Sequence, residues 1–419
     1  MSLQLALMAV VDLIWRFRVS FTILFPAYLL LVHRLRYRRS HQIKSMFSNN
    51  RTLSTMTTKE AHEIMTLLQE LEFPYAFKKA RRIALLKAGG IPTMSRLFAA
   101  TGQNTRRNAA KRAVDTEILL REAQTKDRAS MRYMQAIARM NFFHARYRKA
   151  GKILDKDLLH TLGDGLLETL RIVNRDEWRK LTAVEMCAIG LFHYNLGEDM
   201  NIPFTSLQSH ETGWSDGVHF ANELKAWTIA HEEQVCISGV ATNDQYVRVY
   251  VDSATSALGK CVTDFVRKVL GSELDDTMRN SLNLPAPGHI LRFYLETFTT
   301  IRKLTLRHLS LPRPSYLRVM AVDDDPNPVS GLYNFSHAGF RPWYIKPTFW
   351  TTWSPVAFLM KIAGAKAPGD EKYMPSGYDL TTIGPEPQKG KGIEEMRTTV
   401  EFLKSRGAVE CPFSKGLTR

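Results

Sequence analysis

The sequence has few cysteines and lacks the short motifs that mark many common enzyme classes. Its four cysteines, spread over 419 residues, are far apart and form no C-x-x-C pair. This spacing argues against a disulfide framework or a structural zinc site, and we expect buried thiols in a protein of a reducing compartment. A P-loop, a G-x-G-x-x-G turn, a G-x-S-x-G elbow and an H-E-x-x-H helix are also absent.

Further absences narrow the possible partners and cofactors. The sequence has no H-x-x-H-H cluster of the membrane desaturase kind, and Cys411 in GAVECPFS does not stand in the heme-binding pattern of cytochromes P450. Zinc-finger spacings, basic-zipper heptads and interleaved aromatic and basic residues are not found, which argues against nucleic acid as a partner. The net charge of +16 instead suits anionic membrane headgroups.

The amino terminus is strongly apolar, although its uncharged run is short. The stretch VSFTILFPAYLLLV, residues 19–32, would rise about 21 Å as a helix, against roughly 30 Å of bilayer hydrocarbon. Snorkelling basic side chains at its ends can close this gap. Two arginines precede the run, and five positive residues follow it: Arg34, Arg36, Arg38, Arg39 and Lys44. We therefore predict a single-pass membrane anchor over residues 1–45, with the bulk of the chain in the cytosol. A cleaved signal peptide is the alternative, but no A-x-A-like site follows the run.

Helix signals dominate after this anchor and predict an all-α fold. Two capping-box pairs mark helix starts, Thr57 with Glu60 and Thr182 with Glu185. Asp155 is placed to cap a third helix, and Gly197 to end the helix that Thr182 begins. Other helical runs cover residues 107–123, 218–231, 254–270 and 289–310. Only residues 242–254 alternate as a strand would.

Composition changes near residue 312. Ten of the 18 prolines lie between Pro326 and Pro412, and several aromatic residues are spaced among them. We predict a helical domain over residues 46–312 and a loop-rich carboxyl-terminal lobe over residues 313–419 that packs on it.

Three histidines on predicted helices are candidates for binding a metal or a cofactor: His144, His160 and His193. In the stretch MNFFHARYRKAG, residues 140–151, a helix places four side chains on one face: Met140, Phe143, His144 and Tyr147. A histidine on an apolar face is more often a hydrogen-bonded core residue than a ligand. A neutral imidazole on a helix is nevertheless what a heme iron needs on its proximal side.

The sequence resembles a known family along essentially its whole length. The stretches MNFFHARYRKAG, DLLHTLGDGLL and LTAVEMCAIGLFHYNLGEDMNIP resemble the MpaB family of ER-bound oxygenases of mycophenolic acid biosynthesis. The middle of the chain also resembles the latex clearing proteins, rubber oxygenases that carry b-type heme on a globin-like helical core. The resemblance implies a globin-like domain with heme b and its iron as the cofactor. It further implies cleavage of a C=C bond in the farnesyl side chain of a phthalide meroterpenoid by dioxygen, giving a shortened carboxylic acid, at the ER membrane.

The resemblance also implies which residues form the site. The family has an R-x-x-x-T pattern on one helix and a proximal histidine further along the chain. The segment RAVDT, residues 112–116, matches the first, and His144 matches the second. His144 is therefore the implied iron ligand, and Arg112, Thr116 and Tyr147 are implied to contact the heme.

The match has one departure, and two other functions stay open. Rubber oxygenases have a glutamate ahead of R-x-x-x-T and a lysine directly before the threonine. Here Asp115 stands at the lysine position, and IPTMSRLFAATGQ contains no glutamate. Candidates for the acid–base step, by proximity only, are Asp115, Glu117 and His160.

One alternative function is a non-heme metal hydroxylase that uses His144 with His160 or His193 and a carboxylate such as Glu185 or Asp157. The other is a non-enzymatic membrane scaffold, and the sequence leaves the oligomeric state open.

Overall fold

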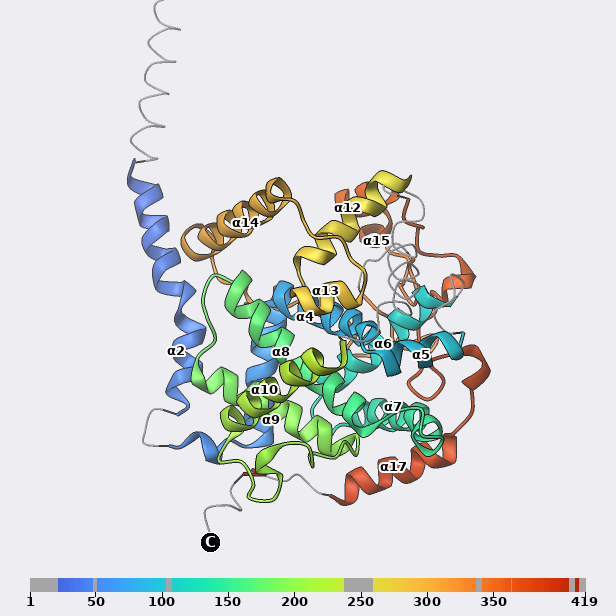
Figure 1. Ribbon diagram of the computed structural model, residues 1–419. Helices are drawn as coiled ribbons and strands as arrows, with labels where there is room; N and C mark the ends of the chain where they lie inside the picture. The colour runs from blue at the N-terminus through green and yellow to red at the C-terminus, as the bar shows by residue number, and fades with distance from the viewer. Residues whose placement is uncertain are drawn as a thin grey trace, which may run out of the picture.

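The structure, a computed structural model, describes residues 22–47, 51–102, 108–236, 259–336, 341–362, 364–406 and 411–413, with the backbone alone for 259–262. These residues form helices joined by loops (Figure 1). Their β-structure is limited to two isolated bridges, Val322 with Phe335 and Tyr333 with Tyr378. The predicted all-α class is confirmed for the described residues, whereas the predicted strand over residues 242–254 lies outside them.

Helices up to residue 236 build most of the centre of the molecule. A helix over residues 22–36 continues into α2. The following helices are α2 (Arg38–Ser45), α3 (Thr58–Thr66), α4 (Pro74–Lys87), α5 (Pro92–Ala100), α6 (Ala109–Thr125), α7 (Met131–Lys149), α8 (Asp155–Asp176), α9 (Ala183–Asp199) and α10 (Gly217–Cys236).

Further helices are described after α10. They are α12 (Gly259–Ser272), α13 (Asp276–Ser281), α14 (His289–Leu304), α15 (Phe349–Trp353), α16 (Pro355–Ile362) and α17 (Ile393–Ser405). The backbone of α14 continues as one π-helical turn, Thr305–Leu309.

Both predicted capping boxes are confirmed. The Thr57 hydroxyl accepts the Glu60 backbone N–H at 3.2 Å, and Glu60 accepts the Thr57 N–H at 2.9 Å. Thr182 and Glu185 make the same reciprocal pair at the start of α9. These bonds satisfy amide groups that have no partner within the helix, so short sequence patterns determined where α3 and α9 begin.

Two predicted helix ends were wrong by a residue or two. Helix α8 begins at Asp155 itself, and it is Asp157 that accepts the Leu154 N–H, at 3.3 Å. Helix α9 passes through Gly197 and ends at Asp199. A Cβ atom at position 197 would lie 2.5 Å from the Phe204 ring, so this glycine provides room for packing rather than a stop.

The core sits where α8 and α9 pack against their neighbours. Helix α9 is buried on nearly every side, as expected for a helix at the centre of a bundle. Its contact with α10 is unusually close, because a Cβ atom on Gly190 would lie 1.9 Å from the Gly217 carbonyl oxygen. Glycine at both positions lets the two backbones touch. Cys187 is buried here and Cys236 is buried at the end of α10, as predicted for these thiols, whereas Cys411 is half-buried.

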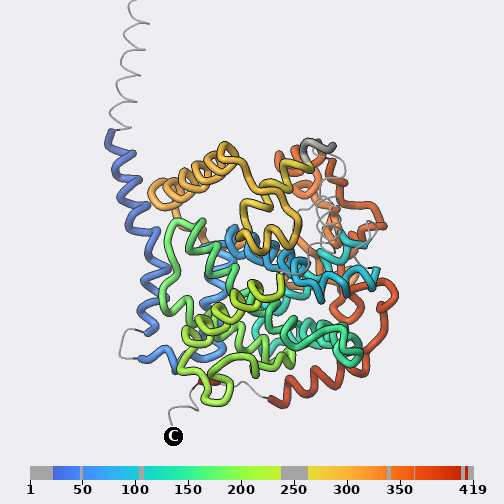
Figure 2. The backbone as a smooth tube through the Cα atoms, in the orientation of Figure 1, coloured from blue at the N-terminus to red at the C-terminus, as the bar shows by residue number. Residues whose placement is uncertain are grey.

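The carboxyl-terminal segment packs onto the helical core. Arg139, on α7, is fully buried, and its guanidinium donates to the backbone carbonyls of Ile383, Gln388 and Lys391. The segment runs down one side of the molecule to α17, which packs against α7 (Figure 2). Loops make up much of it, as predicted, and the division of the chain at residue 312 stays a prediction.

Within the described residues, no helix combines the length and the apolar character needed to cross a membrane. The predicted anchor begins before these residues, because Val19 and the apolar stretch ahead of it lie outside the described part of the chain. The transmembrane helix therefore stays a prediction.

Candidate functional site

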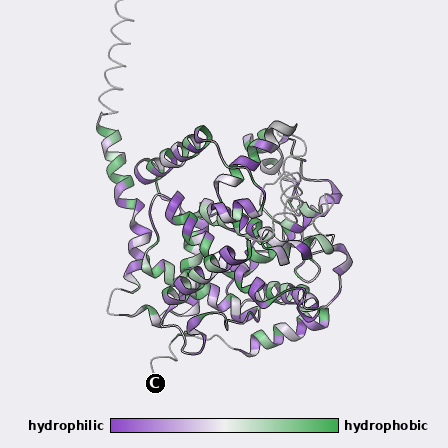
Figure 3. Ribbon diagram, in the orientation of Figure 1, coloured by the Kyte–Doolittle hydropathy of each residue, from purple (hydrophilic) through white to green (hydrophobic). Residues whose placement is uncertain are grey.

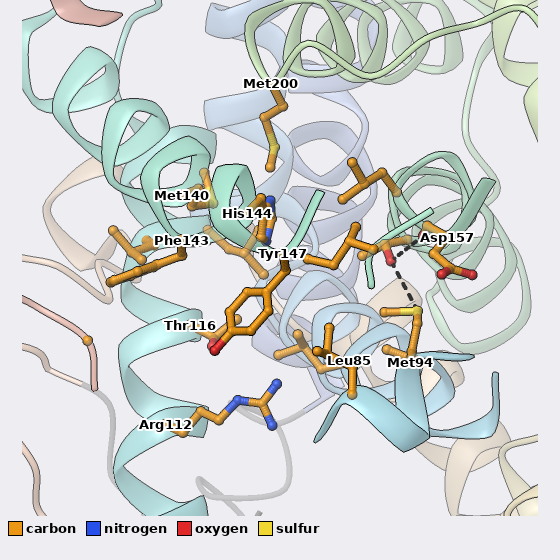
Figure 4. A pocket seen from close by; sticks show the side chains of 18 of the residues that line it. Leu85, Met94, Arg112, Thr116, Met140, Phe143, His144, Tyr147, Asp157 and Met200 are labelled. Atoms are coloured by element: carbon orange, nitrogen blue, oxygen red, sulfur yellow. Dashed lines mark hydrogen bonds between the residues drawn. The ribbon is translucent and has the colours of Figure 1, made fainter. Parts of the chain in front are cut away.

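A largely apolar cavity of about 530 Å³ lies between helices α4 to α9 and the segment 384–388. Its volume is within the range of about 300–1,000 Å³ that is typical of small-molecule and cofactor sites. Leucine, methionine, phenylalanine and alanine side chains make up much of the wall, and a few polar groups converge among them (Figure 4).

The helix face predicted from MNFFHARYRKAG forms part of this wall. All four residues of that face line the cavity: Met140, Phe143, His144 and Tyr147. Among the described residues, no hydrogen-bond partner of the His144 ring is found. Burial, with a smaller contribution from Arg148, lowers the pKa of His144 to about 4. The imidazole is therefore neutral at pH 7, and its remaining accessible surface faces an apolar cavity.

A second histidine, His193 on α9, lines the same cavity. It is 3% exposed, and its Nδ1 lies 2.8 Å from the Ile189 carbonyl oxygen. Because the carbonyl can only accept, Nδ1 carries the proton and Nε2 keeps a free lone pair. Burial lowers the pKa of His193 to about 4, so this ring is also neutral. Gly165 of α8 faces Nε2, and a Cβ atom there would lie 3.4 Å from it.

Helix α6 contributes the residues of the R-x-x-x-T pattern. Arg112 and Thr116 both line the cavity, one helical turn apart, with Tyr147 of α7 across from them (Figure 4). The Arg112 guanidinium lies 4.1 Å from the centre of the Phe98 ring. The cavity thus has a cationic and hydroxyl-bearing edge next to an apolar interior, the arrangement that a ligand with an apolar body and an acidic edge requires.

Asp115 also reaches the cavity wall, but both of its carboxylate oxygens are paired. Lys111 Nζ lies 2.8 Å from one oxygen, and the Tyr344 hydroxyl donates to the other at 2.8 Å. Burial raises the pKa of Asp115 to about 6, although Lys111 opposes the shift. A proton can therefore be held or released near neutral pH at this carboxylate. Lys111 thus places an ammonium group one helical turn before Asp115.

The other two acid–base candidates do not line the cavity. Glu117 is buried beside Arg121, 3.6 Å away, on another side of α6. His160 is fully buried on α8, and its Nε2 lies 3.1 Å from a carboxylate oxygen of Glu232. The structure thus places Asp115 with His144, Arg112, Thr116 and Tyr147, as the sequence suggested, and separates Glu117 and His160 from them.

His160 belongs to a buried ion cluster that sequence reasoning missed. Lys87 Nζ, at its centre, lies 2.6 Å from Glu232, 2.7 Å from Asp164 and 3.3 Å from Glu168. Burial alone would lower the pKa values of Lys87 and His160, but the carboxylates outweigh it and raise both. The pairing of α4 with α10, far apart in the chain, leaves no local sequence signal.

Within the described chain, one group of three residues has the spacing of a metal site: His160, Asp164 and Glu232. Lys87 Nζ lies against both of these carboxylates and supplies the positive charge that a metal ion would bring. The carboxylates proposed for a non-heme site are also engaged. Glu185 is paired with Arg179 at 2.7 Å, and Asp157 accepts the Thr93 hydroxyl at 2.8 Å.

These features describe a helical protein with a largely apolar cavity whose wall carries two neutral imidazoles, His144 and His193. Comparison with known proteins shows which family the chain belongs to. It is 33% identical over 404 residues to the ER-bound oxygenase mpaB' of Penicillium brevicompactum, covering 94% of this chain and 93% of that protein. It is 33% identical over 384 residues to mpaB of the same species, covering 90% and 88%. It is 37% identical over 235 residues to mpaB of Penicillium roqueforti, covering 55% and 77%.

The chain belongs to the MpaB family of ER-bound oxygenases, because two of these similarities extend over most of both proteins. The family resemblance predicted from the sequence is thereby confirmed. No family model matches the sequence.

Proposed function

We propose that this protein is a heme b oxygenase that cleaves a carbon–carbon double bond in the farnesyl side chain of a phthalide meroterpenoid of the mycophenolic acid pathway. The product is a shortened carboxylic acid. The relatives named as oxygenases support the class of reaction. The main support for heme as the cofactor is His144. It is a neutral imidazole at the wall of an apolar cavity, and it has no hydrogen-bond partner among the described residues.

The residues of the cavity fit a heme. His144 would hold the iron through a ring nitrogen, and Arg112 would pair with a carboxylate at the heme edge. Leucine, methionine and phenylalanine side chains would contact the ring and exclude water from it. When bound, the heme would supply the activation of dioxygen. Asp115 would hold a proton at its carboxylate, with Lys111 and Tyr344 fixing the orientation of that group.

The membrane part of the proposal rests on the amino terminus and on the relatives, which are named ER-bound. A single-pass anchor over residues 1–45 would hold the catalytic part at the cytosolic surface of the ER membrane. A farnesyl chain partitions into a bilayer with roughly 0.8 kcal/mol per buried methylene group. A tethered enzyme therefore meets its substrate at a higher concentration than a free one would.

The test is an absorption spectrum with a pyridine hemochrome assay on the full chain, purified in detergent after expression with ample heme. We expect a Soret band, a heme-to-chain ratio near one, and loss or shift of the band in His144→Ala. His41→Ala, which removes an exposed histidine from α2, is the matched control and should leave the spectrum unchanged.

Other results would redirect the proposal. Full heme with an unchanged spectrum in His144→Ala would move the ligand to His193, the other histidine found at the cavity wall. Absence of heme would overturn the heme oxygenase. Stoichiometric iron, lost in His160→Ala, would then favour a non-heme site at His160, Asp164 and Glu232. A colourless and metal-free protein would leave a membrane scaffold.

A further inference from the structure

Helix α14 presents its apolar side chains to the outside of the molecule. Six of them are between 54% and 75% exposed: Ile290, Phe293, Tyr294, Phe298, Ile301 and Leu304. They follow the three- and four-residue steps of one helix face. A helix on a water-facing surface normally turns such a face towards the core. The orientation of α14 is therefore the reverse of that usual for a surface helix, because its apolar face points away from the core.

This orientation is fixed by polar contacts on the inner side of α14. The Arg302 guanidinium donates to the Asp176 carbonyl oxygen at 3.0 Å and to a carboxylate oxygen of Glu177 at 2.9 Å. Lys303 donates to the Arg175 carbonyl oxygen at 2.8 Å. These bonds bind the basic residues of the last turn to the carboxyl-terminal end of α8, so the apolar face has to point away from the protein.

Helices α15 and α16 show a second exposed apolar surface. Seven of their side chains are between 59% and 71% exposed: Phe349, Trp350, Trp353, Val356, Phe358, Leu359 and Ile362. Neither helix has a buried residue. Monomeric soluble proteins seldom leave apolar patches of this extent in water.

These two surfaces lie on the side of the molecule towards which the helix over residues 22–36 extends. In Figure 1, α14 lies at the upper edge and α15 lies just below α12 in the upper part of the view, and the apolar end of the 22–36 helix points the same way (Figure 3). A hydrogen bond links the two regions, because the Tyr28 hydroxyl donates to the Leu309 carbonyl oxygen at 2.7 Å. Ile23 and Leu24, near the start of this helix, are also about two-thirds exposed, at 66% and 65%.

We propose that α14, α15 and α16 form a docking face that lies on a phospholipid bilayer. The inference rests on the proposed membrane association and adds a second, amphipathic attachment to the anchor. Tryptophan and tyrosine favour the boundary between lipid and water, where Trp350, Trp353 and Tyr294 would lie. Arg307, in the turn that follows α14, is exposed and suits anionic headgroups. Its continuity with the predicted anchor favours lipid over a protein partner.

Two attachments have a consequence that one anchor lacks. A single anchoring helix leaves the protein free to rotate about the axis of that helix. A docking face fixes its orientation, so that the cavity keeps one direction and distance relative to the lipid surface.

The test is tryptophan quenching by brominated lipids in nanodiscs that contain phosphatidylcholine and phosphatidylserine. It uses the full chain and requires no bound cofactor, so its outcome is independent of the heme proposal. The double variant Trp350→Phe/Trp353→Phe keeps the face apolar and removes its two tryptophans. Trp343→Phe, which removes a half-buried tryptophan outside the face, is the control.

We expect quenching in the wild type that falls about threefold in the double variant, if Trp15 of the predicted anchor is the third lipid-facing tryptophan and all three contribute equally. The Trp343→Phe control should retain the wild-type loss of intensity. Equal quenching in the wild type and the double variant would overturn the docking face and leave the anchor alone. No quenching in either would overturn both the docking face and the anchor.

Discussion

The cavity and the buried ion cluster enclose histidines in opposite ways. His144 and His193 face the cavity, where burial dominates and lowers the pKa of each to about 4. His160 faces the cluster, where Asp164 and Glu232 outweigh burial and raise its pKa. The residue type is shared, and His160 and His193 are also alike in being almost fully buried, whereas the charge of the neighbours differs.

This difference separates two roles for a buried imidazole. A neutral ring with a free lone pair can bind a metal or accept a proton. Neighbouring carboxylates that raise the pKa of an imidazole favour its protonated form, in which neither nitrogen has a lone pair for a metal. Burial alone therefore does not separate a candidate ligand histidine from a structural one, and the charge of the neighbouring groups has to be considered as well.

Removing Lys87, the central cation of the buried ion cluster, should lower the free energy of unfolding more than any other change considered. Lys87→Met leaves three carboxylates without their shared partner, and we expect the free energy of unfolding to fall by about 3–5 kcal/mol. Urea unfolding of the full chain in a mild detergent measures it. Lys389→Met, at an exposed position, should change stability by less than about 0.5 kcal/mol. Equal effects in both variants would mean that Lys87 does not balance the cluster.

A smaller effect on the free energy of unfolding should come from His193, and it should depend on pH. The folded pKa of His193, about 4, lies below the ordinary value of 6.5, so the unfolded chain binds the proton more readily. Its contribution to stability is present above pH 6.5 and is lost as the pH falls towards 4, by about 3 kcal/mol. In His193→Asn, whose amide can still donate to Ile189, cofactor-free protein should lose less stability over this range. An acid dependence as steep as that of the exposed-site control His308→Asn would contradict the assignment.

The smallest effect on the free energy of unfolding should come from His160, and it should change with pH in the opposite direction. The raised pKa of His160 means that its contribution is fully present below about pH 6.5 and is lost as the pH rises through the folded value. His160→Gln keeps a donor to Glu232 but cannot become charged. We expect a loss of about 1 kcal/mol at pH 6 that disappears at alkaline pH. Stability curves of both proteins from pH 5 to pH 9 measure it, and parallel curves would show that His160 stays neutral.

Local patterns explain what the sequence could predict. The capping boxes at Thr57 and Thr182 act over three residues, and the face shared by Met140 and His144 follows from helix periodicity. These features require no knowledge of the neighbouring chain. The family resemblance added Arg112 and Thr116, which do line the cavity.

Contacts between distant segments explain what the sequence could not predict. Lys87 meets Glu232 only because α4 and α10 both pack on α8, and Asp115 meets Tyr344 across 229 positions. Periodicity also predicted a helix over residues 289–310 but not its direction. The apolar stripe of α14 faces outwards because Arg302 and Lys303 bind to the end of α8.

The segment 384–388 has a consequence for the order in which the site is completed. Helices α4 to α9 contribute most of the cavity wall, and all of them precede residue 200. The last part of the wall, including Gly384 and Pro385, is synthesised almost two hundred residues later. At about 5–20 residues per second, this delay is roughly 10–40 seconds. During that interval the cavity lacks one side, while the amino-terminal segment has already left the ribosome. If the cavity holds the proposed cofactor, that group would have its widest access before the carboxyl-terminal segment completes the wall.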